Sequence, residues 1–584
     1  MGRVRTLLAA GLLLTLAPAW EATLPTAHAA SGFGIAASDF TKVTPGDAVL
    51  FASIQATTAD QSTNFSALQS RVLSKVNLAG LVGAGSAGRQ TASLPKNLAQ
   101  LEAALSAVFN GESAVSVLPV TTAVNSKGKT VPQFHILMDA GLKPGIGAVA
   151  IQGALMLGGL QGTTTTSYKG VTITTLDLKS LLNAAGLGAA GRPALNQSAA
   201  VTVSVAVVNN IAVLSGDLFS VRAAIDAAQG AAPSLASNAD FQTTFAQLPD
   251  SRLSTIFVHA DLQAEQRLAL ALRPQQATNT TPLSGTYSQS FAVSAEPTGV
   301  LVTASPTVTT GAFTRTVSLS PLADSTAGAL PAGTLLYTAI NDPGSLIQAG
   351  LTQVAALTQQ STTHGLALDP LKVINRLLGI DLNQDVVSWM HGEASMAILP
   401  TGSVSGKTAA ARRLSMVVTL KVDSPTQVQQ KLQQIVGTLQ SLSTDPSRLQ
   451  FVQTSGTGGV VEQVLAATPN GTGYAFVNGY LVVATALPAD VAALQGVGSG
   501  SSLASDPQFQ AAVRQAGTAQ AGAVIYANLT ALRQAGEQIA QDEGANLTRY
   551  DTNIRPWLST FTSLSMVARA GSGGGGALFL GIAP

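Results

Sequence analysis

A short stretch that occurs twice, at 105–119 and at 386–400, constrains the fold of this chain more than any other feature. Each copy reads as the last turn of a helix, a stop at a glycine, and a buried strand that runs to a proline. The pairs Asn110-Gly111 and His391-Gly392 predict a left-handed residue at the end of each helix. The stretch therefore predicts the same helix-to-strand junction at two places in the chain.

The residues before the second copy have helical spacing. Leu382, Val386 and Trp389 lie at i, i+4 and i+7, which places them on one face of a helix. Asp381 and Asp385 are expected to cap and charge its first turn, because the alternating acidic pattern of a calcium loop is missing.

Other segments recur in the same order along the two halves of the chain, with a spacing between equivalent positions that shrinks slowly. An ordered series of this kind indicates an internal duplication. The matching segments are 44–54 and 330–340, 134–138 and 414–420, 207–214 and 476–483, 234–242 and 502–510, and 257–262 and 524–529.

The pattern within each half predicts an α+β fold. Tight turns between successive strands imply antiparallel pairing, and interspersed helices imply a covering layer. We expect two tandem duplicated units, each a mainly antiparallel sheet covered by helices. The first unit is predicted at 43–310 and the second at 327–584, with a linker at 311–326.

The N-terminus is predicted to be a signal peptide over 1–30, followed by a polar lead-in at 31–42. Two arginines precede an apolar run at Leu7–Leu16, and the small-x-small residues Ala27-His28-Ala29 form a site for cleavage after Ala29 or Ala30. The mature protein is therefore expected outside the cytoplasmic membrane, in the periplasm or at the surface of a bacterial cell.

The composition excludes some partners. Charged residues make up 10% of the chain, less than half of the usual figure of about 25%, while hydrophobic residues make up 46%. Counterion release on nucleic acid needs clustered lysine and arginine, so no nucleic-acid partner is expected.

No later segment has the ~18 consecutive apolar residues of a membrane span, so no integral membrane anchor is predicted. Cysteine is absent, which excludes disulfides and a lipoprotein-type anchor.

Several strings resemble an exported bacterial family catalogued as domain of unknown function 3352. The second half carries the resemblance best, and the first half follows by the internal duplication. The strings are Leu330–Tyr337, the stretch from Gly379 to Glu393, Gly473–Tyr480, and Ser502–Ser505 with Phe509. This resemblance implies an extracytoplasmic protein, and it implies no activity, cofactor or catalytic residue.

Two glycine-rich segments imitate nucleotide-binding motifs. Gly83–Gly88 fits G-x-G-x-x-G, but no strand precedes it and no acidic residue follows at the required distance. Gly402–Thr408 resembles a phosphate loop with its first glycine missing, and it joins two predicted strands. Both are interpreted as loops, and no cofactor is predicted.

No catalytic constellation stands out among the histidines. His135, His259, His364 and His391 show no metal-ligand spacing, and no G-x-S-x-G elbow marks a nucleophile. Each is interpreted as a hydrogen-bonded or exposed histidine. A triad assembled in space from distant positions stays open.

Glu112, Glu393 and His391 are the candidates for a polar site. The two glutamates hold equivalent places after a helix stop and could form an acidic pair across a duplicated cleft. The alternative is that each hydrogen-bonds nearby backbone N–H groups or an arginine where its strand begins.

Aromatic residues gather in the second half, where they could form a ligand platform. Trp389, Tyr337, Tyr474, Tyr480 and Tyr526 fall mostly within apolar strands or on a helix face, which favours core packing.

We therefore expect a non-enzymatic exported protein with a binding or structural role at the cell envelope. Its partner would be a cell-envelope component or a hydrophobic small molecule, which an apolar groove could carry. The alternative is an extracytoplasmic hydrolase with a dispersed catalytic site.

Overall fold

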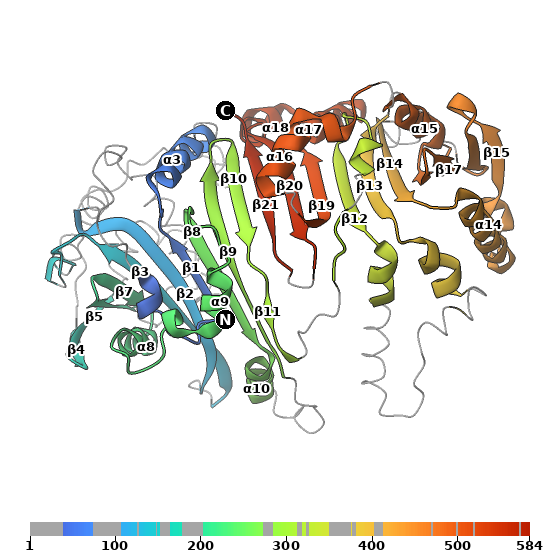
Figure 1. Cartoon of the computed structure of the whole chain (residues 1–584). Helices are drawn as coiled ribbons and strands as arrows, with labels where there is room; N and C mark the ends of the chain where they lie inside the picture. Colours follow the sequence, from blue (N-terminus) through green and yellow to red (C-terminus); the bar gives the residue numbers. More distant parts are fainter. Residues whose placement is uncertain are drawn as a thin grey trace, which may run out of the picture. The chain divides into compact units, whose positions relative to one another are not determined.

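The structure is a computed structural model of the chain (Figure 1). It describes residues 39–73, 107–124, 128–147, 149–151, 153, 164–177, 202–272, 284–311, 318–322, 326–349, 375, 381–401, 413–468, 471–497, 500–517, 520–571 and 574–584. The chain divides into two compact units. Unit 1 comprises Met1–Ser70, Asn77–Pro297 and Val302–Thr314, and unit 2 comprises Arg71–Val76, Thr298–Leu301 and Arg315–Pro584.

The strands of unit 1 form an antiparallel sheet. They are β1 (Leu50–Ile54), β2 (Phe109–Val124), β3 (Thr130–Leu142), β4 (Thr164–Tyr168), β5 (Val171–Asp177), β6 (Thr202–Val208), β7 (Ile211–Ser215), β8 (Ser254–Asp261), β9 (Thr286–Glu296) and β11 (Val308–Thr309), and β10 (Gly299–Ala304) follows β9 in the chain. Neighbours pair in the order β4-β5-β6-β7-β3-β2-β1-β8-β9-β11.

Helices cover the sheet of unit 1. They are α2 (Phe40–Val43), α3 (Ala59–Leu73), α8 (Leu218–Ala228), the short η1 (Leu235–Ser237), α9 (Ala239–Phe245) and α10 (Leu262–Leu272). Val221, Ala224 and Ile225 form the apolar stripe of α8, which packs on one face of the sheet. A smaller core that includes Ile151 lies on the other face.

The strands of unit 2 follow the same order as those of unit 1, with β12 to β20 in the places of β1 to β9. They are β12 (Leu336–Asn341), β13 (Glu393–Pro400), β14 (Leu414–Lys421), β15 (Phe451–Ser455), β16 (Val461–Leu465), β17 (Gly473–Val477), β18 (Tyr480–Ala484), β19 (Ala521–Asn528), β20 (Phe561–Arg569) and β21 (Gly576–Ile582). All neighbours pair antiparallel in the order β15-β16-β17-β18-β14-β13-β12-β19-β20-β21.

Helices of unit 2 lie on both faces of its sheet. The longer ones are α14 (Pro425–Leu442), α15 (Leu487–Gly496), α16 (Pro507–Ala516), α17 (Leu529–Asp542), α18 (Thr548–Asn553) and α19 (Arg555–Leu558), and the short ones are η4 (Thr326–Gly328), η5 (Leu382–Val386), η6 (Val387–Trp389), η7 (Pro446–Leu449), η8 (Thr457–Gly459) and η10 (Leu503–Ser505). The main core lies between one sheet face and helices α15 and α16. A second cluster packs α14 against one part of the opposite face.

The fold confirms the predicted α+β class with antiparallel sheets and helices. It also confirms the two tight hairpins, because the Asn209-Asn210 and Asn478-Gly479 turns have positive φ at both residues. This is the backbone of a type I′ turn, and asparagine and glycine adopt it more readily than other residues.

The helix predicted through Leu382, Val386 and Trp389 is wrong in type. The chain makes a π-helical turn over Leu382–Val386 and then a 3₁₀ turn over Val387–Trp389. The indole N–H of Trp389 donates to the carbonyl of Asp385 at 2.6 Å. That carbonyl is the one an α-helix would pair with the backbone N–H of Trp389.

The predicted left-handed glycine is confirmed at Gly111, with φ of +90°, and is wrong at Gly392. Glycine is needed at position 392 because two backbone segments approach closely there. A Cβ on this residue would lie 2.3 Å from the carbonyl oxygen of Lys421. The first helix stop is also wrong by two residues, because β2 already begins at Phe109.

Some predictions fall outside the described residues. They concern the signal peptide at 1–30, most of the lead-in at 31–42, the two glycine-rich motifs and His364. The strands that flank 402–412 are neighbours, as Pro400 pairs with Leu414 in an antiparallel ladder.

Candidate functional site

The two candidate glutamates hold matching places in their units and are bound locally. Glu112 accepts hydrogen bonds from the side-chain amides of Asn110, at 2.9 Å, and Gln55, at 3.3 Å. Glu393 is buried and accepts the backbone N–H of Thr326. Each carboxylate is therefore held by neighbours of its own unit, through a backbone N–H in one case and amide side chains in the other.

His391 lies at the surface, with 59% of its side chain exposed. Its Nδ1 is 3.0 Å from Oδ1 of Asp342, and the other oxygen of Asp342 accepts the hydroxyl of Ser345 at 2.5 Å. An exposed polar contact of this kind contributes little to stability.

His135 is buried between a hydroxyl and a carboxylate. Its Nε2 is 2.8 Å from Oγ1 of Thr121, and its Nδ1 is 3.4 Å from Oδ2 of Asp217. This order of groups resembles a nucleophile, base and acid. Asp217, however, caps helix α8 by accepting the N–H of Ser220, and it also accepts the hydroxyl of Ser215.

His259 has a serine between itself and an acid. Its Nδ1 is 2.8 Å from Oγ of Ser288, and that hydroxyl donates to Asp240 at 2.8 Å. Ser288 is fully buried. The hydroxyl is thus committed to the carboxylate, so this group reads as a core network rather than an exposed nucleophile.

Asp139 and Asp490 are among the buried acids that escaped prediction from the sequence. Asp139 lies in β3 with both carboxylate oxygens lacking a hydrogen-bond partner among the described residues, and burial raises its pKa well above the usual value. Asp490 lies in α15, where burial raises its pKa to about 6 although Ser415 donates a hydrogen bond to it at 2.5 Å. The available signal was an acid inside an otherwise apolar strand or helix.

The two aspartates that were predicted to cap the helix, Asp381 and Asp385, have different roles in the structure. Asp381 accepts the N–H groups of Asn383 and Gln384, as a cap does. Asp385 instead lies 2.5 Å from the ammonium group of Lys431 on α14, which holds the pKa of Asp385 below its usual value.

The aromatic residues of unit 2 pack mainly in its cores. Tyr337 and Tyr526 are each 1% exposed and both make edge-to-face contacts with Phe509. Tyr474 contacts Phe451 and Phe476 in the cluster under α14. These rings stabilise the fold and do not form an exposed platform.

The face of the unit 2 sheet opposite α15 and α16 is apolar, and much of it is not covered by the helices that the structure describes. Side chains alternate between the two faces along each strand, and on this face they are exposed or half-buried. We call it the open face, and it consists of Leu336, Thr338, Ile340, Ala394, Met396, Ile398, Met416, Val418, Val483, Ala523, Ile525, Leu564, Met566, Ala568, Leu578 and Leu580. It contains one polar residue, Thr338, and no charged residue.

Cross-strand register aligns part of the open face into one row. Each member is paired directly with the next on the neighbouring strand, and we call this set the central row. It runs Val483, Val418, Met396, Thr338, Ile525, Met566, Leu578 over strands β18, β14, β13, β12, β19, β20 and β21. With neighbouring strands ~4.8 Å apart, the row is about 29 Å long.

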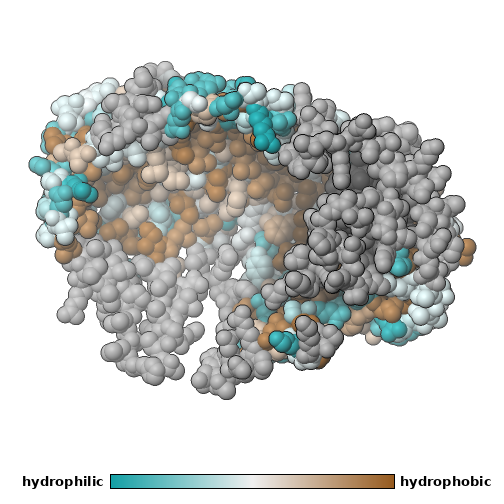
Figure 2. Space-filling view, turned by 180° about the vertical axis from the view of Figure 1, so that it is seen from behind, coloured by the Kyte–Doolittle hydropathy of each residue, from teal (hydrophilic) through white to brown (hydrophobic). Residues whose placement is uncertain are grey.

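Figure 2 shows apolar residues gathered over a hollowed surface on this side of the molecule. The most exposed members of the open face are Met416 at 47%, Met566 at 44%, Val483 at 42%, Ile525 at 37% and Met396 at 36%. α14 covers the neighbouring cluster around Leu420 and Leu481, against which Ala394 at the margin of the open face also packs. Apolar side chains gathered in this way mark an interaction surface rather than ordinary scattered exposure.

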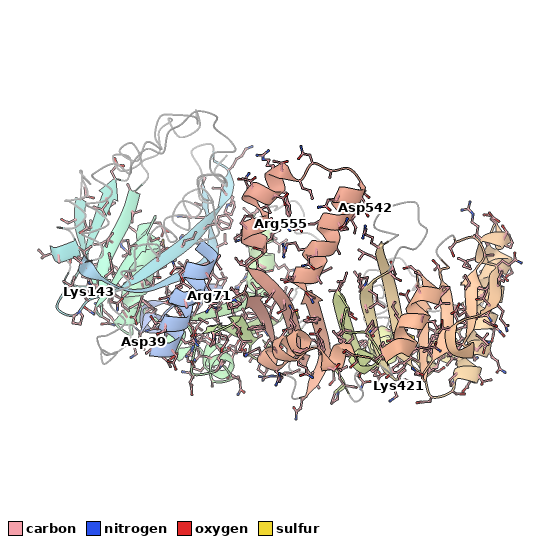
Figure 3. The ribbon with its side chains drawn as sticks, turned by 90° about the horizontal axis from the view of Figure 1, so that it is seen from above. Asp39, Arg71, Lys143, Lys421, Asp542 and Arg555 are labelled. Atoms are coloured by element: carbon pink, nitrogen blue, oxygen red, sulfur yellow. The ribbon has the colours of Figure 1, made fainter. Side chains whose placement is uncertain are left out.

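Several charged residues of unit 2 form ion pairs among its helices and strand ends. Asp542, at the end of α17, holds Arg413, and Arg555 of α19 lies 3.2 Å from Glu537 (Figure 3). No described cluster of acidic residues and histidines has the size of a metal site. Among the described helices, none has the length and apolar character needed to cross a membrane.

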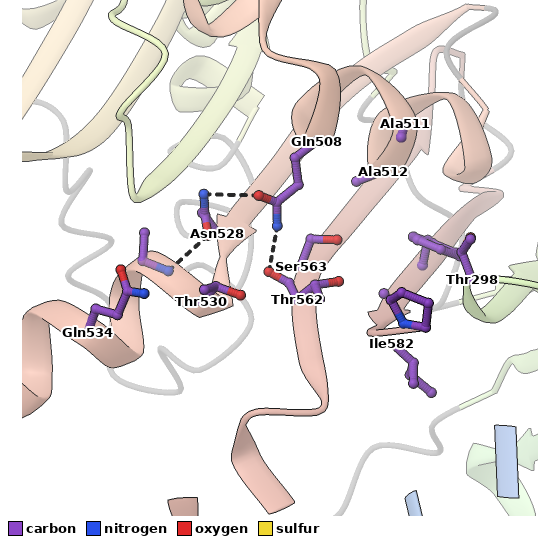
Figure 4. Close-up of a pocket in the computed structure, with 14 residues that line it drawn as sticks. Thr298, Gln508, Ala511, Ala512, Asn528, Thr530, Gln534, Thr562, Ser563 and Ile582 are labelled. Carbon is purple, nitrogen blue, oxygen red and sulfur yellow. Dashed lines mark hydrogen bonds between the residues drawn. The ribbon is translucent and has the colours of Figure 1, made fainter. Parts of the chain in front are cut away.

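A separate pocket of about 510 Å³ lies among α16, α17 and strands β19 to β21 (Figure 4). Two of its amides are engaged with the protein, since Gln508 donates to the carbonyl of Thr562 at 2.7 Å and accepts from Asn528 at 3.3 Å. Asn528 also caps α17 by accepting the N–H of Ala531. These groups join the helices to the sheet.

Fold and site define an antiparallel α+β protein in which the described residues leave one apolar sheet face partly exposed. The chain belongs to the family described as protein of unknown function (DUF3352), whose model matches residues 154–455, just over half of the sequence. The match begins before β4 of unit 1 and ends with β15 of unit 2. The chain matches no curated protein and no solved structure.

Proposed function

We propose that this protein is a non-enzymatic, exported binder of an apolar, lipid-like molecule, and that the open face of unit 2 holds the ligand. The observation that carries the proposal is the set of aligned apolar side chains without a charged residue among them. Burial of such surface is favourable by about 25 cal/mol per Å². A ligand that covers the face would gain this free energy without desolvating a charge.

The methionines of the open face fit an adaptable binding surface. Met396, Met416 and Met566 are three of the seven methionines of the chain. Methionine has a flexible, polarizable side chain that adjusts to ligands of different shape. This favours a ligand recognised by hydrophobicity over one recognised by hydrogen bonds.

Native mass spectrometry of the chain from about Ser31, purified without detergent, tests the proposal first. We expect extra mass that is lost on denaturation and that has the composition of a lipid. A bare chain that also fails to take up a lipid added in solution would overturn the proposal.

A matched pair of substitutions locates the ligand. Val483 lies on the open face at 42% exposure, and Val452 of β15 lies off this face at 47% exposure. V483T is expected to weaken binding of the neutral dye N-phenylnaphthylamine several-fold, while V452T leaves it unchanged. Equal dye affinities in the two variants would place the binding elsewhere.

The second candidate function is the extracytoplasmic hydrolase, and the arrangement of Thr121, His135 and Asp217 is the one observation in its favour. Burial of His135 and the capping role of Asp217 favour a structural reading. Assay of ester hydrolysis separates the two. Turnover that T121V abolishes and that T122V keeps would replace binding with catalysis.

We also propose that the two units arose by duplication and that the protein acts in the bacterial cell envelope. The common strand order supports the duplication. So do matching contacts: Pro45 bridges to Ser234 in unit 1, and Pro331 bridges to Ser502 at the equivalent place in unit 2. The predicted signal peptide supports the location.

A further inference from the structure

We propose that the ligand is a linear hydrocarbon chain that lies extended across the strands along the central row, with its polar head beyond the end of the row. This inference rests on the proposed function and adds the class and direction of the ligand. It follows from the shape of the apolar path rather than from its mere presence.

The longest apolar path on the open face runs across the strands. Along any one strand the face offers at most three positions, such as Leu336, Thr338 and Ile340, which span about 14 Å. Across the strands the central row spans about 29 Å without interruption by a charge. An extended chain therefore buries about twice as much length across the sheet as along it.

The rows on the two sides of the central row set the width of the apolar path. On one side Met416, Ile398 and Leu336 form a second apolar row in register. On the other side the row through Ala394 and Ile340 continues into small residues, and its β14 end is covered by the α14 cluster. The free width is therefore a few side chains, while the free length is that of seven strands.

Thr338 is the single weak point of the path. It lies in the middle of the central row, between Met396 and Ile525, and it brings a hydroxyl group beneath the chain. Valine has the same shape without the hydroxyl. T338V should therefore tighten the binding of any chain that crosses this position, which gives a gain-of-function test that misfolding cannot imitate.

The first experiment measures affinity for saturated lysophosphatidylcholines from octanoyl to stearoyl, each below its micelle concentration. The affinity should rise about fourfold per added methylene, because each buried methylene contributes about 0.8 kcal/mol. An affinity that does not change with chain length would overturn the extended arrangement.

The second experiment compares three variants over the same series. T338V should tighten long chains about fourfold or more and leave octanoyl binding nearly unchanged, because a short chain can avoid the middle of the row. I525T should weaken long chains by a similar factor. V452T, which lies off the open face, serves as the control and should match the wild type throughout.

The outcomes separate the two proposals. If no lysolipid binds the wild type, both fail. If V483T weakens dye binding but T338V and I525T leave the chain-length series unchanged, the open face binds an apolar ligand and the extended chain across the strands is wrong.

Discussion

Asp139 lies in an apolar core of unit 1, where its cross-strand neighbours are Ala114 and Val213. At the equivalent place of unit 2, Thr419 faces Ser395, and the two hydroxyls lie 2.7 Å apart. The same register position thus holds a satisfied polar pair in one unit and an acid without a described partner in the other. Burial without a partner disfavours the charged form of the Asp139 carboxyl, so the folded protein favours the protonated form.

Replacing Asp139 should change the pH dependence of stability. Burial raises the pKa of folded Asp139, whereas the unfolded chain releases this proton above about pH 4. The contribution is thus full below about pH 4 and is lost as the pH rises toward the folded-state pKa. D139N should be more stable than the wild type at neutral pH, with a flatter decline, in urea unfolding at several pH values.

The control is D423N, at an exposed aspartate, which should keep the decline of the wild type. A decline that is as steep in D139N as in the wild type would show that Asp139 is not its source.

Individual side chains were predicted least well. Core packing of Tyr337 and Tyr526 followed from their place in apolar strands. The partners of His135 and His259 did not, because Asp217 and Asp240 come from distant helices and only the folded sheet brings them together. The unpartnered state of Asp139 depends on Ala114, another distant residue.

Replacing each of two glycines, Gly437 and Gly392, by alanine should change the stability of the fold in opposite directions. In α14, a Cβ at Gly437 would meet nothing within 4 Å, so G437A should stabilise by up to about 1 kcal/mol through helix propensity. At Gly392, the Cβ would collide with the backbone of Lys421, so G392A should cost on the order of 1–3 kcal/mol. Thermal melts of the two variants check both signs, and a stabilised G392A would contradict the contact.

Oxidation of the methionines on the open face should weaken ligand binding. Peroxide transfers one oxygen to a thioether, which gives a polar sulfoxide and water. Met396, Met416 and Met566 are 36–47% exposed and accessible to the reagent. Dye affinity should fall after peroxide treatment and return with methionine sulfoxide reductase. A variant with leucine at all three positions should resist, and equal loss in that variant would refute the assignment.

Elements were predicted well where local chemistry decides them. The hairpin turns were set by Asn209-Asn210 and Asn478-Gly479 themselves. The π-helical turn was missed because a side chain, the indole of Trp389, takes the place of a backbone donor. Periodicity of apolar residues does not detect such a substitution.

On the scale of the whole molecule, the α+β class followed from the order of segments, but the open face did not. Alternation tells which residues of a strand share a face, and both faces of β12 to β14 and β19 are rich in apolar residues. Which face the helices cover depends on the connections between strands. From the sequence pattern alone, both faces of these strands would be predicted to lie in a hydrophobic core.

Export gives a prediction for the whole chain. Expression of the full sequence in a bacterium should yield a mature protein that begins near Ala30 or Ser31, because the small-residue site precedes these positions. The mass of the protein released from the periplasm or medium checks this. A product that retains Met1–Ala29 would refute cleavage.

The open face also has a consequence for how the protein behaves in solution. When no ligand covers it, an exposed apolar surface can associate with the same surface on another copy as the protein concentration rises. The empty protein should therefore associate reversibly as its concentration rises, and the loaded protein should stay monomeric. If the proposed ligand keeps the protein monomeric, the protein is fully soluble only with the ligand bound. The amount of ligand in the envelope would then determine how much of the protein stays in solution.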